Sequence, residues 1–192
     1  DEIILADNDV ESFYPRIILN QRLFPPHLGE AFLQVYNAIV ETRIHAKSEA
    51  AKAKKAGDKA GAKRWKTIAD SLKITINGSF GKLGNKYSTL YAPQLMLQVT
   101  ITGQLVLLML IEMLEEAGIS VISGNTDGIV SKYHKDRHND VRAIIAEWEK
   151  RTNFKTEETQ YSAVYSRDVN SYVAIKTDGG DEEARFLDER LG

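Results

Sequence analysis

The spacing of apolar and polar residues predicts long helices between a first strand and a group of later strands. Apolar side chains recur every three or four residues in residues 29–55 and 63–80, which is the period of an amphipathic helix. Residues 94–117 are more uniformly apolar and are followed by Gly118, which predicts a third long helix with a glycine stop. Shorter patterns predict helices at residues 16–21 and 140–151 and strands at residues 3–6, 119–123, 129–133, 161–165 and 171–176.

Two features of this order define the predicted architecture. The alanine- and lysine-rich segment around Gly57 to Gly61 separates two long helices, so we expect an antiparallel helical hairpin. The polar turn Gly124 to Gly128 separates two strands and predicts a β-hairpin. Because the strands are segregated from the helices, we expect an α+β fold: an antiparallel sheet with helices on one face and the helical hairpin as an insertion.

Composition narrows the class of protein. The 192 residues are 43% hydrophobic and 27% charged, which is globular and excludes a disordered or fibrous chain. The absence of cysteine excludes a disulfide scaffold, a cysteine nucleophile and a cysteine-ligated zinc site. The longest unbroken apolar run, Leu105 to Ile111, is too short for a transmembrane helix, so we expect no contact with a membrane.

The charge is unevenly distributed along the chain. Residues 43–73 hold ten basic and three acidic side chains, a net charge of +7, whereas the whole chain carries −2, which leaves −9 elsewhere. Such an asymmetry suggests a polyanionic partner, although a solvated helical face explains the same pattern. The basic residues are Arg43, Lys47, Lys52, Lys54, Lys55, Lys59, Lys63, Arg64, Lys66 and Lys73.

Two carboxylates occupy places where strands end. Asp9 follows the first strand, and Asp127 lies in the turn of the β-hairpin more than a hundred residues later. In an antiparallel sheet these two ends can lie side by side, where like charges are costly unless a cation joins them. Magnesium suits such oxygen ligands, but aspartate is also common in turns for structural reasons.

Three segments resemble the polymerase motifs of the family B DNA polymerases. The run Asp9-Val10-Glu11-Ser12-Phe13-Tyr14-Pro15-Arg16-Ile17-Ile18 is similar to the family's Asp-x-x-Ser-Leu-Tyr-Pro-Ser-Ile-Ile. Lys73-Ile74-Thr75-Ile76-Asn77-Gly78-Ser79-Phe80-Gly81 is similar to Lys-x-x-x-Asn-Ser-x-Tyr-Gly, and Asn125-Thr126-Asp127-Gly128 to Asp-Thr-Asp-Ser. Val99-Thr100-Ile101-Thr102-Gly103-Gln104 resembles a run that often precedes the third motif, and Asn170-Ser171-Tyr172 lies where the family has a Lys-x-Tyr primer contact. The resemblance extends from Asp9 to about Lys176 and is closest to phage and other viral members.

The resemblance implies template-directed DNA synthesis, with transfer of a nucleotide from a dNTP to a primer 3′-hydroxyl. Asp9, Asp127 and Lys73 would be catalytic, and Asp9, Val10 and Asp127 would hold two magnesium ions, with manganese as a substitute. The incoming nucleotide would contact Ser12, Phe13, Tyr14, Arg43, Lys47, Lys73 and Asn77. The template and primer would contact Phe80, Gly81, Thr126 and Tyr172.

The resemblance also implies a domain plan. Residues 1–28 and 85–178 would form the palm, residues 29–84 the fingers hairpin, and residues 179–192 a charged tail where a thumb would start. The chain begins with Asp inside an apolar run, so we expect it to be a piece of a longer protein. Its partners would be a DNA primer-template, dNTP and the missing exonuclease and thumb regions, and its location the cytoplasm of a host cell.

Three departures from the family pattern leave a second interpretation open. Asn125 replaces the first aspartate of the third motif, Gly78 replaces a serine, and Asn170 stands where lysine is usual, with Arg167 the nearest basic residue. These departures motivate the alternative of a catalytically silent palm that binds nucleic acid. A reverse transcriptase-like palm is less consistent, because such enzymes place adjacent aspartates at the hairpin tip.

Overall fold

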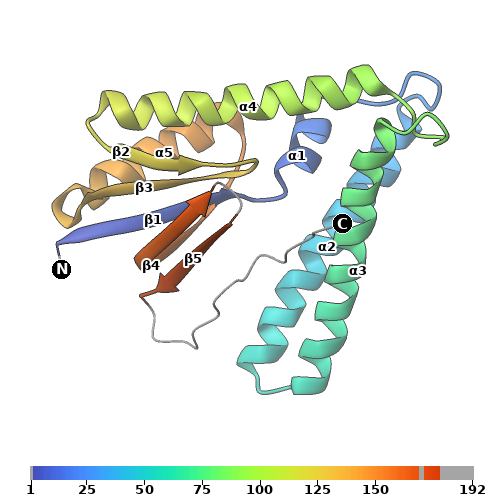
Figure 1. Ribbon diagram of the computed structural model, residues 1–192. Helices are drawn as coiled ribbons and strands as arrows, with labels where there is room; N and C mark the ends of the chain where they lie inside the picture. Colours follow the sequence, from blue (N-terminus) through green and yellow to red (C-terminus); the bar gives the residue numbers. More distant parts are fainter. Residues whose placement is uncertain (1, 169–170, 178–192) are drawn as a thin grey trace. The chain divides into compact units, whose positions relative to one another are not determined.

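The fold is known from a computed structural model that describes residues 2–168 and 171–177. The predicted tail at residues 179–192 and Asn170 lie outside the described residues. The chain divides into two units: Asp1–Phe13 with Gly103–Gly192, and Tyr14–Thr102. The first unit contains all the described strands, and the second contains the helical hairpin (Figure 1).

The strands of the first unit form one antiparallel sheet in the order β2-β3-β1-β4-β5 (Figure 1). Its members are β1 (Ile3–Val10), β2 (Ser120–Gly124), β3 (Gly128–His134), β4 (Thr156–Asp168) and β5 (Ser171–Lys176). The central strand β1 pairs with β3 on one side and β4 on the other, so Asp9 lies opposite Gly128 and Glu157. The predicted α+β class and the β-hairpin are confirmed.

One face of this sheet packs against helices. Alternate residues of β1, namely Ala6, Asn8 and Val10, are buried, and Asn8 lines a groove together with residues of α5 (His138–Thr152). The indole N–H of the fully buried Trp148 in α5 donates a 2.9 Å hydrogen bond to the carbonyl of Val106 in α4 (Pro93–Glu116). This face therefore forms the core of the unit, and the opposite face of β1 carries Leu5, Asp7 and Asp9.

The second unit is built around α2 (Ala31–Lys55) and α3 (Lys59–Leu83), which follow the short helix α1 (Phe13–Asn20). Small buried side chains, Ala46 on α2 and Ala69 on α3, suit the close packing of these two helices. Their connection turns at Gly57, whose φ of 76° lies in the left-handed region that favours glycine. The predicted helical hairpin is confirmed.

Several boundaries differ from the sequence prediction because caps and pairing partners set them. Helix α3 begins four residues earlier than predicted, since the carboxylate of Asp58 caps it by accepting from Gly61 N at 2.9 Å. The helix also extends beyond the predicted end at residue 80, because Gly81 lies inside it and it ends at Leu83 with Gly84 as its cap. Strand β4 has 13 residues because it pairs with both β1 and β5.

Helix α4 is more exposed than its sequence suggests. Leu97, Ile101, Leu105 and Leu108 are each about half exposed and recur at helical spacing. By length and composition, α4 is the one helix in the described part of the chain that could cross a membrane, so the exclusion based on the longest apolar run was too strict. Length and composition are weak indications, because core helices of folded domains pass the same test.

Candidate functional site

The C-terminal end of the central strand β1 and the turn of the β2–β3 hairpin lie side by side. They form one border of the sheet, across the strand ends, which we call the edge. The amide of Val10 donates a 2.7 Å hydrogen bond to the carbonyl of Asp127, and Asp9 is the register partner of Gly128. Asp9 and Asp127 are both exposed. The structure therefore brings together two predicted site residues that are 118 positions apart in the sequence.

Gly128 leaves space that the Asp9 side chain occupies. A Cβ atom at residue 128 would collide with Oδ1 of Asp9 and would lie 3.1 Å from the carbonyl oxygen of Asn8. Every residue except glycine would therefore push the Asp9 carboxylate away from the hairpin. The absence of a side chain at Gly128 is part of what positions Asp9.

Asn125 shapes the hairpin turn. Its Oδ1 accepts hydrogen bonds from the amides of Asp127 at 3.3 Å and Gly128 at 3.2 Å. The backbone N–H of Asn125 donates to the carbonyl of Gly128 at 3.0 Å. Such an Asx arrangement is a common way for asparagine or aspartate to close a turn. Asparagine at position 125, where the family pattern has aspartate, thus keeps the turn and gives this edge one negative charge fewer.

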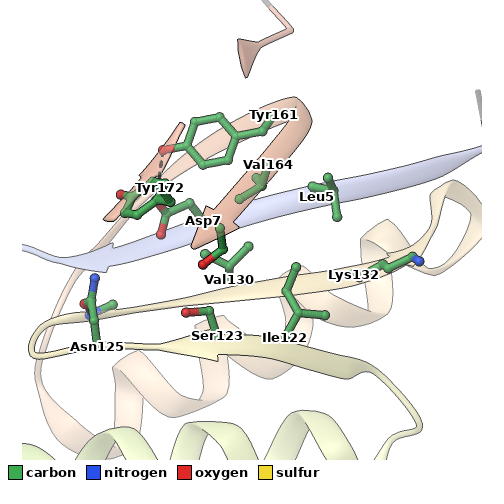
Figure 2. A pocket seen from close by; sticks show the side chains of 12 residues that line it. Leu5, Asp7, Ile122, Ser123, Asn125, Val130, Lys132, Tyr161, Val164 and Tyr172 are labelled. Carbon is green, nitrogen blue, oxygen red and sulfur yellow. Dashed lines mark hydrogen bonds between the residues drawn. The ribbon is translucent and has the colours of Figure 1, made fainter. Parts of the chain in front are cut away.

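The open face of the sheet is hollowed next to this edge (Figure 2). The hollow has a volume of about 570 Å³ and lies entirely within the first unit. Asn125 and Gly128 line it from the hairpin, Asp7 from β1, and Tyr172 from β5. Tyr172, predicted to contact the primer, therefore shares a cavity with the hairpin turn.

Asp7 and Tyr161 form a partly buried polar pair in this hollow that the sequence analysis missed. The hydroxyl of Tyr161 donates a 2.9 Å hydrogen bond to Oδ2 of Asp7, and the Asp7 residue is only 7% exposed (Figure 2). Burial, together with the negative charge of Asp7, raises the pKa of Tyr161 well above its ordinary value. The two-residue spacing of Asp7 and Asp9 on a strand was the available signal, because it puts both on one face.

The oxygen atoms at this edge suit a hard divalent cation that would also be bound by the phosphates of a substrate. In the described part of the chain, no group of three or more His, Cys, Asp or Glu side chains is arranged to hold a metal. The edge offers the carboxylates of Asp9 and Asp127 and nearby backbone carbonyls. Magnesium is usually held by one or two carboxylates plus substrate phosphates and water, so these residues fit it.

The second unit carries three predicted cationic residues on two helices. Arg43 and Lys47 lie on α2, and Lys73 lies on α3. A hydrogen bond from Lys66 lowers the pKa of Asp70, and the positive charges of Lys73 and Arg43 lower it further. Arg43 and Lys73 therefore both act on the Asp70 carboxylate although they belong to different helices.

Aromatic residues near the end of α3 also come together within this unit. The rings of Tyr14 and Phe80 are 4.7 Å apart between centroids and tilted by 44°. Phe80 also packs against a buried cluster that includes Leu83 and Leu95. The predicted site residues Asn77 and Gly81 are exposed on the same helix.

Ser12 lies in the turn that follows β1, and Phe13 is the first residue of α1. Ser12 has a φ of 50°, which is unusual for a residue other than glycine and often marks a functional site. Phe13 is 3% exposed and its ring meets that of Phe154 edge-on at 5.2 Å. The structure thus places Phe13 in the core of the first unit, and its nucleotide-binding role stays a prediction. Thr126 lies in the hairpin turn between Asn125 and Asp127.

Comparison with known proteins defines the class to which this fold and site belong. The family model for DNA polymerase family B matches residues 26–169. The chain is a member of the family B DNA polymerases. The matched range contains the second and third motifs and the whole of α4, whereas Asp9 lies before it.

One curated relative gives a finer comparison. The DNA polymerase alpha catalytic subunit of Xenopus laevis is 42% identical to this chain over 60 residues. Those residues are 31% of this chain and 4% of the Xenopus protein. The chain therefore spans a small part of that relative's length. Because the relative is eukaryotic, the predicted viral origin stays a prediction.

Proposed function

We propose that this chain is the catalytic part of a DNA polymerase that transfers a nucleotide from a dNTP to a primer 3′-hydroxyl on a template. The observation that carries the proposal is the hydrogen bond from Val10 N–H to the carbonyl of Asp127, which places the end of β1, with Asp9, beside the hairpin turn that contains Asp127. Membership of the family B polymerases supports this reaction class.

Asp9 and Asp127, with the carbonyl of Val10, would hold two divalent ions. Bound magnesium would supply charge neutralisation for the triphosphate and a lower pKa for the primer 3′-hydroxyl. The role of the protein residues is to position the reactants, because phosphoryl transfer depends mainly on position and electrostatic stabilisation. Gly128 contributes by leaving room for the Asp9 carboxylate.

The cations of the helical hairpin would bind the incoming triphosphate. Arg43 and Lys47 are four residues apart on α2, and Lys73 and Arg43 both act on the Asp70 carboxylate. Asn77 and Phe80 follow Lys73 by four and seven residues on one side of α3, where they would face the nascent base pair. This arrangement supports the assignment of the hairpin as the fingers.

Residues around the hollow and the turn after β1 would contact the primer and the sugar. Tyr172 lines the same cavity as Asn125 and Gly128, so we place the primer end in that cavity, beside Thr126. The ring of Tyr14 packs at a tilt against that of Phe80 and would lie beneath the sugar of the incoming nucleotide, with Ser12 and Phe13 positioning the start of the helix that carries Tyr14. Gly81, exposed on α3, would allow the template strand to approach closely.

The proposal includes the domain plan implied by the family. The strand-bearing unit would be the palm and the α2–α3 hairpin the fingers, with exonuclease and thumb regions elsewhere in the same protein. The cytoplasm of a host cell is the proposed compartment. DNA and dNTP are the proposed partners, as for other members of the family.

The direct test replaces each strand-end carboxylate in the intact protein. Asp9→Asn and Asp127→Asn should each abolish nucleotide incorporation in a primer-extension assay, while binding of primer-template measured by fluorescence anisotropy persists. Asp136→Asn is the matched control, since Asp136 is an exposed carboxylate outside this edge and should leave both readouts unchanged. Near-normal incorporation by either site variant would refute the assignment.

A silent palm that binds nucleic acid is the second candidate. It is favoured by the uncharged Asn125, which leaves the edge with one negative charge fewer than the family pattern and whose side-chain oxygen accepts from two backbone amides of the turn. If primer-template binds but no condition supports incorporation, including replacement of magnesium by manganese, this candidate holds.

A further inference from the structure

The tip of the α2–α3 hairpin carries a dense cluster of cations beyond those assigned to the triphosphate. The tip cluster comprises Lys54 and Lys55 at the end of α2 and Lys59, Lys63 and Arg64 at the start of α3. All five side chains are exposed. In the described part of the chain none of them forms a salt bridge, whereas the neighbouring Lys52 and Lys66 pair with Glu49 and Asp70.

Helix stability explains only half of this cluster. Cations in the last turn of a helix, as at Lys54 and Lys55, interact favourably with the negative end of the helix dipole. At the first turn the preference is reversed, yet α3 begins with Lys59, which directly follows the capping carboxylate of Asp58 and has no acidic residue in its own turn. Lys59 and Lys63 are also four residues apart, a like-charge spacing that destabilises a helix. Helix stability therefore gives no reason for cations at Lys59 and Lys63.

The surroundings of the tip cluster favour a ligand recognised by charge alone. The residues between the cations are Ala56, Gly57, Asp58, Ala60, Gly61 and Ala62, so the cluster contains one carboxylate and no large apolar side chain that could anchor a partner. Flexible lysines on such a surface suit the phosphate backbone of a nucleic acid, which is bound without sequence readout. An acidic protein segment would more often require apolar anchors in addition.

We propose that the tip cluster of the α2–α3 hairpin is a second nucleic-acid contact, which binds the phosphodiester backbone of a DNA strand outside the nucleotidyl-transfer site. The choice of DNA as the polyanion rests on the proposed function. The contact itself is defined by Lys54 and Lys55 at the end of α2 and by Lys59, Lys63 and Arg64 at the start of α3. Figure 1 shows the connection between these two helices.

The test measures how DNA affinity depends on salt, without catalysis. Fluorescence anisotropy would follow the intact protein binding a single-stranded oligonucleotide or a blunt duplex in EDTA without dNTP. The variant Lys59→Gln/Lys63→Gln/Arg64→Gln removes the three cations that helix stability does not explain. The control Lys82→Gln/Lys135→Gln/Lys150→Gln removes the same charge from exposed lysines elsewhere.

The expected change follows from counterion release. Each neutralised phosphate contributes about −0.7 to the slope of log K against log salt for single strands and about −0.9 for duplex, so the tip variant should flatten the slope by about 2 to 3. If the slope changes only with the single-stranded oligonucleotide or only with the duplex, that form of DNA is the one bound by the tip. The melting temperature of the tip variant should equal or exceed that of the unmodified protein, because unfavourable charges are removed.

Four results would overturn the proposal. An unchanged slope in both arms, or an equal change in the control, would show that the tip does not contact DNA. A lowered melting temperature would show that the cations serve stability. If poly-glutamate bound as tightly as DNA through the same three residues, the proposed partner class, a nucleic acid, would be wrong. Because the assay needs no turnover, loss of incorporation in the carboxylate variants and loss of the tip contact are separate outcomes.

Discussion

At the scale of single residues, Gly128 is important because it has no side chain. Its backbone faces the Asp9 carboxylate so closely that a Cβ atom cannot be added without moving Oδ1 of Asp9. Asn125 closes the same turn through two backbone amides. The geometry of the proposed metal site is therefore controlled by two residues that need not touch a metal.

Gly128→Ala tests this control. The methyl group should displace the Asp9 carboxylate and lower the single-turnover rate of incorporation by about 100-fold, the order of loss expected for a misplaced catalytic group. Gly124→Ala is the control in the same hairpin, because its Cβ would meet only Ile111 and Ile129 at 3.6 and 3.8 Å, which is ordinary contact. Equal rates for the two variants would contradict the role of Gly128.

At the scale of elements, Glu149 joins α5 to the start of β4. Its Oε1 accepts from the amide and hydroxyl of Thr156 at 2.6 and 2.9 Å, and its Oε2 accepts from Lys155 at 3.1 Å. Burial acts to raise the pKa of Glu149, but these hydrogen bonds and the charge of Lys155 outweigh it, and the pKa is lowered from the ordinary 4.5.

This junction predicts a pH-dependent contribution to stability. A carboxyl whose pKa is lower in the folded state stabilises the fold above its unfolded pKa, and this contribution is lost as the pH falls through the folded pKa. Glu149→Gln should therefore lower the free energy of unfolding by about 1–2 kcal/mol near pH 7 and by much less below pH 4 or so. Urea denaturation at several pH values would measure it.

Glu147→Gln provides the control for Glu149. Glu147 pairs with Arg151 on the exposed side of the same helix, where a single ion pair contributes little to stability. A loss for Glu149→Gln that does not depend on pH, or one no larger than that of Glu147→Gln, would show that the junction is not maintained by the charged carboxylate.

At the scale of the whole molecule, the sequence predicted the elements better than their ends. The strong periodicity of α2 and α3 located the hairpin, but the start of α3 depends on the cap at Asp58, which periodicity does not reveal. The length of β4 depends on two pairing partners that are distant in the sequence. The outward-facing apolar residues of α4 were equally invisible to a pattern that records composition alone.

The candidate site was predictable to a similar degree. The β-hairpin pattern and the motif resemblance together located Asp9 and Asp127, and the register of β1 with β3 brings their strand ends together. The sequence spacing could place Asp7 on the same strand face as Asp9, but not its hydrogen bond to Tyr161, because that bond depends on the pairing of β1 with β4, and the two residues are 154 positions apart. The tight contact between Gly128 and Asp9 likewise depends on three-dimensional register.

The measurement that tests the central claim most directly is the single-turnover rate of nucleotide incorporation by the intact protein and by Asn125→Asp. Restoring the family's aspartate increases repulsion between carboxylates and also strengthens attraction for cations, and these effects oppose each other. The account predicts robust activity in the unmodified protein and a change within about tenfold, or about 1.4 kcal/mol of barrier. Barely measurable activity that Asn125→Asp raises by several orders of magnitude would contradict it and identify the natural chain as a silent palm.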